Sequence, residues 1–202
     1  MSIIAENILA IASVLSEGEI ISPKDFLHLG SRMAIDQTLS RLVKQNKLIR
    51  VGRGTYVFPV IGRFGVRPPA VEKTVQSLAL KTGETIVSHG AAAANVLGLT
   101  TQVPIRQIFL TGGANRKFHF NSLTVELKHV PHWQLLCENM PAGMAIRALA
   151  WMGKSHIEKS LEKLYKNLPQ EEWRKLYSVR SSLPSWMAES IGKANARMSI
   201  HG

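Results

Sequence analysis

The sequence has 202 residues, which is enough for one or two compact domains, each with its own hydrophobic core. Hydrophobic residues make up 45% of the chain and charged residues 19%, a balance that excludes a disordered protein and indicates a globular one. The formal net charge of +11 favours polyanionic partners, although charge alone is a weak signal because many basic proteins are merely soluble.

The opening residues do not have the pattern of a targeting or membrane segment. Glu6 interrupts the apolar run, no basic region precedes it, and the apolar residues recur at helical spacing. We therefore expect a cytoplasmic protein without membrane association. Cys137 is the single cysteine, so we expect no internal disulfide and interpret it as a small packed residue.

Three short helices are predicted in the first quarter of the chain. The spacing of isoleucine and leucine over residues 4–15 predicts an amphipathic helix. Ser22 and Pro23 are typical of a helix start, as N-cap and first helical position, and Gly30 is typical of its end. Ser31 then predicts the N-cap of a third helix.

The third helix has two different faces. Ile35, Leu39, Leu42 and Asn46 fall on one side, which we expect to be the buried one. The other side carries polar, basic and thioether side chains: Met33, Gln37, Ser40, Arg41 and Lys44. Amides and cations on an exposed helix face are typical of a helix that reads base edges in the major groove of DNA.

A β-hairpin is predicted directly after this helix. Residues 47–51 and 55–58 are rich in β-branched and aromatic residues, and Gly52 and Gly54 are expected to supply the positive φ angles of a tight turn. Arg53 lies at the tip, where it can reach a phosphate or a minor groove. Taken alone, a solvated surface hairpin explains these residues equally well, but the basic helix before it favours nucleic-acid binding. Three helices and a hairpin predict a winged helix-turn-helix.

Positive charge is concentrated in this region. Residues 31–63 contain seven basic residues and one acid, a net excess of six charges out of eleven in about a sixth of the chain. We predict that the DNA-binding residues lie on the third helix and the hairpin. They are Ser31, Arg32, Gln37, Ser40, Arg41, Lys44, Lys47, Arg50 and Arg53.

A domain boundary is predicted within residues 59–69. This stretch is rich in proline and glycine and has neither helical nor strand periodicity. We therefore predict a winged helix-turn-helix domain over residues 1–62 and a second domain over residues 63–202.

The second domain is predicted to contain a small sheet and several helices. A helical face resumes at Val71, and the run HGAAAANVLGL predicts a further helix. From Pro141 to the end of the sequence the pattern is helical. Within this part, KSHIEKSLEKLYKNL predicts a solvated helix of mixed charge. Strands are predicted at residues 84–88, 104–111, 117–120 and 123–130. The predicted fold class is therefore α+β.

Histidine and cysteine residues do not form a recognisable chemical site. His129 and His132 lie near Cys137, but without the spacing of a zinc site, so we interpret them as surface or internally bonded residues. Ser88 and His89 are adjacent, and neighbours on a strand point to opposite faces, so we interpret them as the turn and cap of the next helix.

An enzymatic function is not predicted either. The loop TGGANRK over residues 111–117 has two glycines and two basic residues, but it lacks the Walker spacing and no helix follows it, which favours a hairpin turn with a basic rim. The acids Glu72, Glu84 and Glu126 are scattered, whereas metal-dependent phosphoryl transfer usually requires a pair. We predict no catalytic residues, no metal site and no cofactor.

Two segments resemble a known family when they are taken together. QTLSRLVKQNKLIRVGRGTYVFP and IVSHGAAAANVLGLTTQVPIRQIFLTGGANRKF are similar to the AbiEi-type antitoxins of type IV toxin–antitoxin systems, which act in abortive infection. The likeness covers about residues 1–150. The second segment is the more specific of the two, because the RVGRGTYV hairpin is shared with many winged-helix repressors.

The resemblance implies a two-part transcription regulator. The N-terminal part would bind inverted repeats in the promoter of its own operon, with Gln37, Arg41 and Lys44 on the helix and Arg50 and Arg53 on the hairpin as DNA-reading positions. The C-terminal part would counter a nucleotidyltransferase-like toxin without forming a stable complex with it. The resemblance assigns no antitoxin residues, and the oligomeric state is not predicted. The alternative is a module that binds RNA or a protein partner and has no antitoxin activity.

Overall fold

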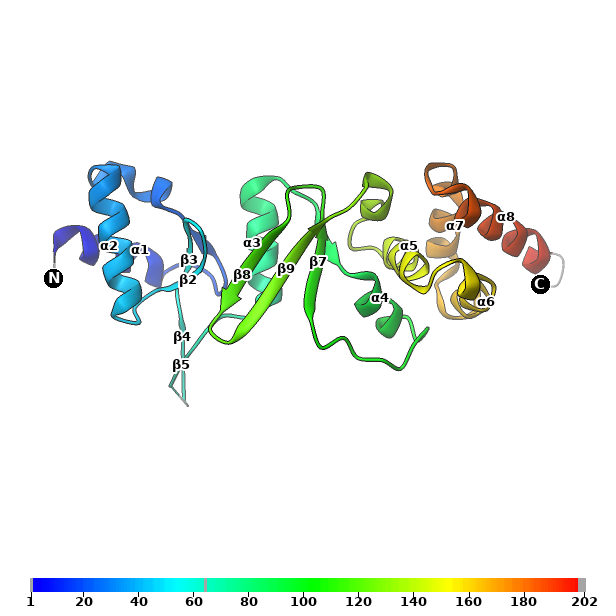
Figure 1. The fold of residues 1–202 in the computed structure, drawn as a ribbon, viewed down its shortest axis with the longest axis horizontal. Coiled ribbons are helices and arrows are strands. Elements are labelled where there is room, and N and C mark those ends of the chain that lie inside the picture. The colour runs from blue at the N-terminus through cyan, green and yellow to red at the C-terminus, as the bar shows by residue number, and fades with distance from the viewer. Residues whose placement is uncertain (1, 64, 200–202) are drawn as a thin grey trace. The chain divides into compact units, whose positions relative to one another are not determined.

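The computed structural model describes residues 2–63 and 65–199 (Figure 1). The chain forms two compact units that are described separately here. Unit 1 comprises the residues up to Glu84 together with Arg116–Glu126, and unit 2 comprises Thr85–Asn115 together with the residues from Leu127 onward. Helices and small sheets occur in the same chain, so the predicted α+β class is confirmed.

Unit 1 begins with helices followed by a hairpin, an arrangement compatible with a winged helix-turn-helix. Its helices are α1 (Ile3–Ser13), the 3-10 helix η1 (Pro23–Leu29), α2 (Arg32–Lys44) and α3 (Val71–Thr82). Its strands are β1 (Ile20–Ile21), β2 (Ile49–Gly52), β3 (Thr55–Val57), β4 (Val60–Gly62), β5 (Gly65–Arg67), β8 (Arg116–Phe120) and the first part of β9 (Leu123–His129). Strands β1, β3 and β2 form an antiparallel sheet in that order, with Ile20 opposite Val57 and Arg50 opposite Tyr56.

The core beneath α2 follows the predicted helical periodicity. Ile35, Leu39 and Leu42 are buried and pack with Ile8 of α1 and Phe26 of η1. Placing apolar residues at spacings of three and four on α2 therefore directs one face of this helix into the core and leaves the opposite face in solvent.

The prediction for Asn46 is wrong. This residue is exposed and lies beyond the end of α2 with a φ of 57°, so it is not part of the buried helix face. The amide of Asn46 donates to the carbonyl of Val43 (2.9 Å) and that of Lys47 to the carbonyl of Leu42 (2.9 Å), the two hydrogen bonds of a Schellman motif. Asparagine tolerates the left-handed conformation that this motif requires, which explains why the helix ends here.

The predicted second helix forms as a 3-10 helix rather than an α-helix. Pro23 occupies its first turn, and the Ser22 amide donates to the Asp25 carboxylate (2.7 Å), so the start signals are read correctly. At seven residues, this segment is longer than most 3-10 helices, which usually run about three or four residues.

Residues 59–69 are not an irregular linker. Strands β4 and β5 pair antiparallel, with Ile61 directly opposite Val66, and form a two-stranded hairpin within unit 1 (Figure 1). Each strand has three residues, which is too short for a strand periodicity to be visible in the sequence.

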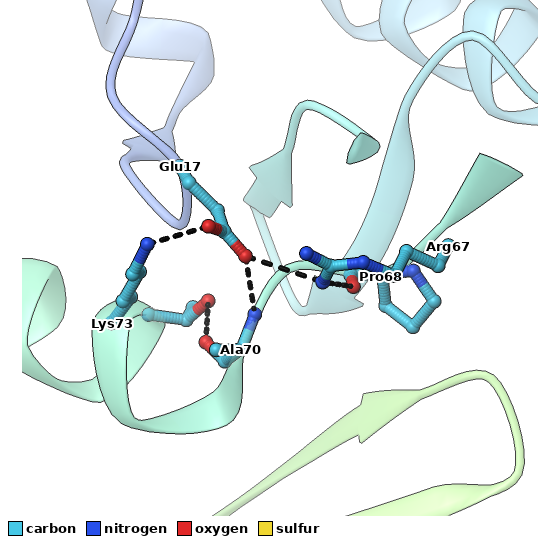
Figure 2. A network of polar contacts seen from close by, with 6 residues as sticks. Glu17, Arg67, Pro68, Ala70 and Lys73 are labelled. Carbon is cyan, nitrogen blue, oxygen red and sulfur yellow. Dashed lines mark hydrogen bonds and ion pairs between the residues drawn. The ribbon is translucent and has the colours of Figure 1, made fainter. Parts of the chain in front are cut away.

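Helix α3 is fastened to unit 1 by the turn before β1. The Glu17 carboxylate accepts hydrogen bonds from the Ala70 amide (3.1 Å), Lys73 Nζ (2.5 Å) and Arg67 Nη1 (3.2 Å), as Figure 2 shows. Ala70 is the N-cap residue of α3 and has no capping side chain of its own, so Glu17 supplies the acceptor and a negative charge at the helix N-terminus. Next to it, Gly18 has a φ of 85°, and a Cβ there would lie 2.7 Å from Lys73 Cβ.

Unit 2 is mainly helical. Its helices are α4 (Gly90–Val96), η2 (His132–Leu135), α5 (Pro141–Met152), η3 (Lys154–His156), α6 (Ile157–Asn167), α7 (Gln170–Ser178), η4 (Arg180–Ser182) and α8 (Ser185–Ser199). Strand β6 (Ile86–Ser88) pairs antiparallel with β7 (Gln107–Thr111), and the four-stranded sheet has the order β6-β7-β9-β8. The strand predicted at residues 104–111 starts only at Gln107.

Helices α4 and α5 pack at unusually close range because small residues line their contact. Ala93 and Ala94 are fully buried, and a Cβ at Gly90 would lie 2.3 Å from the carbonyl oxygen of Arg147 on α5. The run HGAAAAN, part of the segment that resembles the antitoxins, therefore has a packing role in this structure.

Candidate nucleic-acid interface

The outward face of α2 contains the predicted base-reading side chains. The Ser31 hydroxyl caps the helix by accepting from the Ala34 amide (3.3 Å), which confirms the predicted N-cap. With the helix start set there and one face buried in the core, five predicted residues lie together on the exposed face: Met33, Gln37, Ser40, Arg41 and Lys44.

Arg32 differs from the other basic residues of α2 because an acid already pairs with it. Its Nε lies 2.9 Å from Asp36 Oδ2, one turn further along the helix, and both side chains are about half exposed. Such an exposed pair contributes about 0–1 kcal/mol, so it restrains Arg32 only weakly. Arg41 makes a long hydrogen bond from Nη2 to Thr38 Oγ1 (3.4 Å), which leaves its other donors available.

The hairpin β2–β3, called the wing below, presents Arg50 and Arg53 to solvent. Arg50 Nε donates to the carbonyl of Gly52 (3.3 Å), and Thr55 Oγ1 donates to the carbonyl of Arg53 (3.3 Å), so the loop is braced by its own side chains. Gly54 has a φ of 64°, as the predicted tight turn requires. Lys47, at the start of the wing, is half-buried and takes part in a polar interaction within the protein.

Gly52 has a different role from the one predicted. It does not have a positive φ, and a Cβ at this position would lie 2.9 Å from Cδ1 of Phe118 on β8. The wing strand β2 is therefore backed by a strand that lies more than sixty residues later in the sequence. Lys117 and His119 flank Phe118 on β8 and are exposed, so β8 adds polar side chains to unit 1. Lys117 belongs to the predicted basic rim, whereas His119 was not singled out from the sequence.

Negative charge is missing from a long stretch that includes this site. Residues 37–71 contain seven basic residues and no aspartate or glutamate. From Gln37 onward, α2 and the wing therefore contain no acid along the chain, and Asp36, just before Gln37, pairs with Arg32. A polyanion such as DNA is a better partner for this surface than a protein surface that carries both acidic and basic residues.

In the loop over residues 111–117, which was considered for phosphate binding, two glycine carbonyl groups contact the side chain of His129. His129 Nδ1 lies 3.1 Å from the carbonyl oxygen of Gly112 and 2.9 Å from that of Gly113, and the His129 amide donates to Asn115 Oδ1 (2.6 Å). Carbonyl oxygens turned toward an imidazole do not form an anion cradle. The interpretation of this segment as a hairpin turn is wrong. The segment joins β7 to β8, but these strands are not neighbours in the sheet, because β9 lies between them.

His89 acts as a helix cap. Its Nδ1 accepts from the Ala91 amide (3.2 Å) at the start of α4, which confirms the predicted cap. Burial lowers the pKa of His89, with a smaller effect from Lys128 in the same direction, and both effects favour the neutral ring that can accept this hydrogen bond. Within residues 2–63 and 65–199, no three histidine, cysteine, aspartate or glutamate side chains are grouped so as to hold a metal ion.

Arg147 is the most unusual charged residue of unit 2. It is 1% exposed, and its Nε, Nη1 and Nη2 atoms are buried without a hydrogen-bond partner among the described residues. Burial lowers the pKa of Arg147 to about 10, partly offset by Cys137, and burial raises the pKa of the Cys137 thiol. Sequence reasoning did not single out Arg147, because a single arginine in an apolar helix has no local signature.

None of the helices in the described part of the chain is long and apolar enough to cross a membrane. The fold and the exposed basic surface of unit 1 define an α+β protein with a winged-helix-like N-terminal unit. The family model described as "Family of unknown function (DUF6088)" matches residues 7–176, so the chain belongs to the DUF6088 family.

One solved structure shares the fold. The crystal structure of the RV2827C protein from Mycobacterium tuberculosis is similar to this chain with a TM-score of 0.53 and 13% sequence identity, over 96% of this chain and 76% of that one. At this identity the similarity concerns the fold alone. No curated protein matches the sequence.

Proposed function

We propose that this protein is a DNA-binding transcriptional repressor that acts on the promoter of its own operon. The observation that carries the proposal is the exposed face of α2 followed by the wing, within a stretch of 35 residues, 37–71, that contains no acid. In this proposal α2 enters the major groove and the wing contacts the backbone or the adjacent minor groove.

The proposed DNA-binding residues have two roles, recognition of bases and contact with phosphates. Gln37 and Arg41 both lie on α2: Gln37 has the paired donor and acceptor that bind an adenine edge, and Arg41 has the paired donors that bind a guanine edge. Lys44 and Arg53 are placed to contact phosphates, which provide affinity and salt dependence without reading the sequence. Arg32 contributes less, because Asp36 shares its charge.

We further propose that the protein is the antitoxin of a type IV toxin–antitoxin system and counters a nucleotidyltransferase-like toxin without forming a stable complex. Support for this part comes from the resemblance of two sequence segments to AbiEi-type antitoxins. The second segment contains α4, and the close packing of α4 against α5 accounts for the small residues of that segment. The antitoxin role therefore rests on the resemblance, whereas the DNA-binding role rests also on the surface of unit 1.

The DNA-binding proposal is tested by measuring the affinity of the full chain for three nucleic acids: its own promoter, a random duplex of the same length and a structured RNA. We expect the promoter to bind tightest, and replacing Arg41 with alanine to weaken that binding by about 1–3 kcal/mol. The matched control is Lys163→Ala on α6, which removes an exposed charge from unit 2. Equal affinity for all three nucleic acids would favour the RNA-binding or protein-binding alternative.

The antitoxin proposal is tested separately in cells. The neighbouring reading frame is expressed from an inducible promoter, with this protein supplied from a second plasmid under an unrelated promoter so that repression cannot explain rescue. We expect the neighbour to arrest growth and this protein to restore it, both for the wild type and for Arg41→Ala. Growth arrest that this protein does not relieve would contradict the antitoxin role and leave the repressor role untouched.

A further inference from the structure

The strands β4 and β5 form a hairpin whose described residues are largely exposed. No described residue of either strand is buried, and Ile61 and Val66, which lie directly opposite each other, are 76% and 60% exposed. A two-stranded hairpin is marginally stable in water by itself, and this one keeps two β-branched apolar side chains in solvent. In Figure 1 the hairpin projects from the rest of unit 1.

The charges on this hairpin favour a polyanion over a second copy of the chain. Arg63 lies at the bend and is exposed, and the hairpin belongs to the stretch 37–71 that contains no acid. Two copies that met through this face would bring their Arg63 side chains together without an acid of the hairpin to pair with them. Arg67, at the base, is already held by Glu17 and by the carbonyl of Pro68 (3.0 Å).

The hairpin is continuous with the candidate interface. Its strand β4 starts three residues after the end of β3 in the wing. Ile61 and Val66 also line a groove of about 430 Å³ together with Asn46 and Lys47, which form the turn that ends α2. Leu9 and Ser13 of α1 line the same groove, so the hairpin lies near α1 and near the C-terminal end of the helix that carries Gln37 and Arg41.

We propose that the β4–β5 hairpin is a further DNA-binding element that enters a minor groove of the operator next to the site of α2. Arg63 would occupy the groove, as arginine does in narrow, A·T-rich minor grooves. Ile61 and Val66 would contact the sugars and base edges, because minor-groove binders combine basic side chains with apolar ones at the groove floor. This inference rests on the proposed DNA-binding function and adds a second groove contact to it.

The experiment compares footprints of the full chain on its own promoter. Hydroxyl radicals report minor-groove protection, and dimethyl sulfate reports guanine protection in the major groove. The variants are Arg63→Ala, Ile61→Thr with Val66→Thr, and Arg41→Ala, with Lys163→Ala as the control for loss of one surface charge. Threonine keeps the β-branch that suits a strand, so the double variant changes polarity more than conformation.

We expect Arg63→Ala to bind the promoter about fivefold or more weakly and to lose hydroxyl-radical protection beside the α2 site, while major-groove protection persists. The double threonine variant should lose the same protection, and netropsin, which occupies A·T minor grooves, should compete with the wild type but not with Arg63→Ala. Arg41→Ala should lose the major-groove protection instead.

Two results would overturn the inference while leaving the proposed function intact. In the first, Arg63→Ala and the threonine variant bind and protect DNA as the wild type does, while Arg41→Ala is weakened. In the second, the threonine variant changes the sedimentation coefficient but not the footprint, which would identify the hairpin as a self-association surface. If the wild type protects no DNA, the proposed function itself fails, and this inference fails with it.

Discussion

Units 1 and 2 have similar total charge but arrange it differently. Unit 1 contains thirteen basic and eight acidic residues, and unit 2 contains twelve and six. Ion pairs form in both units. Unit 2 has Glu172 with Lys175 (2.8 Å), Glu189 with Lys193 (2.5 Å) and Glu158 with Arg197, and unit 1 has pairs around Glu17, Asp25 and Asp36. In unit 1 the acids lie outside residues 37–71. The position of the charges, and not their sum, therefore distinguishes the candidate interface.

The two units also differ in where packing is tightest. In unit 2 the backbone of α4 lies against α5, and the only buried charged side chain of the described residues, Arg147, is on α5. In unit 1 the polar contacts that fasten α3 are at the surface, around Glu17 (Figure 2). Changes in unit 2 should therefore affect stability most, and changes in unit 1 should affect charge-dependent properties.

The largest expected effect is that of Gly90→Ala. The added methyl would lie 2.3 Å from the Arg147 carbonyl oxygen and 2.6 Å from Trp151 Cβ, so the helices must separate. We expect the free energy of unfolding, measured by urea denaturation, to fall by about 3 kcal/mol or more. The control is Gly192→Ala on α8, where nothing lies within 4 Å and alanine should be neutral or stabilise by up to about 1 kcal/mol. Equal urea midpoints for both variants would refute close packing as the distinguishing property of unit 2.

Arg147→Met is expected to stabilise the protein. Methionine fills most of the volume of arginine and removes a buried charge whose three nitrogens have no partner among the described residues. Replacing buried charges with apolar side chains of similar size is neutral or stabilising by about 1–4 kcal/mol, and we expect an increase of about 1 kcal/mol. Arg147→Ala leaves a cavity and should be at least about 2 kcal/mol less stable than Arg147→Met. A methionine variant less stable than the wild type would show that the guanidinium has partners in solution.

Arg53→Ala tests the charge arrangement of unit 1. If the wing contacts a phosphate, the slope of log affinity for promoter DNA against log salt concentration should decrease by about 1. Lys166→Ala on α6 removes the same charge from unit 2 and should leave the slope unchanged. Equal slopes for the two variants would mean that total charge, rather than its position, governs DNA binding.

Glu17→Gln is expected to have the smallest effect on stability, present at neutral pH and lost in acid. Hydrogen bonds from Lys73 and from the Ala70 amide lower the pKa of Glu17 from its ordinary value of 4.5 to about 2. The depressed pKa means that Glu17 stabilises the fold fully above pH 4.5 and loses this contribution as the pH falls toward 2. The free energy of unfolding of Glu17→Gln should therefore change less over that interval than that of the wild type. Glu162→Gln on α6 is the control for removing a surface carboxylate, and an unchanged acid dependence in Glu17→Gln would contradict the stabilising role of the hydrogen bonds to Glu17.

Local chemistry was sufficient to predict much of α2 and the wing. Ser31 caps the helix, Ile35 and Leu39 direct its inner face, and Gly54 forms the turn, since each of these effects depends on neighbours a few residues away. The same reasoning placed Gln37, Arg41 and Lys44 in solvent, where the structure has them. Their role in DNA binding stays a prediction.

Contacts between residues far apart in the sequence could not be predicted from local patterns. The cap of α3 comes from Glu17, more than fifty residues away, and the support of the wing comes from Phe118. Neither leaves a signature in the sequence, because a side chain that caps or packs against a remote element satisfies no local pattern. Asn46 was misplaced for a related reason: a helical wheel continues the helix beyond the point where a left-handed residue ends it.

The sequence by itself determined the α+β class, the helix and turn of the candidate interface, and the concentration of positive charge between residues 31 and 63. Only the tertiary structure decided that α3 and β8 belong to unit 1, that β4 and β5 form an exposed hairpin, and that the buried Arg147 nitrogens have no hydrogen-bond partner among the described residues. The reason is physical. Helix periodicity, caps and turns are set by interactions over a few residues, whereas burial and ion pairing depend on which distant segments come together when the chain folds.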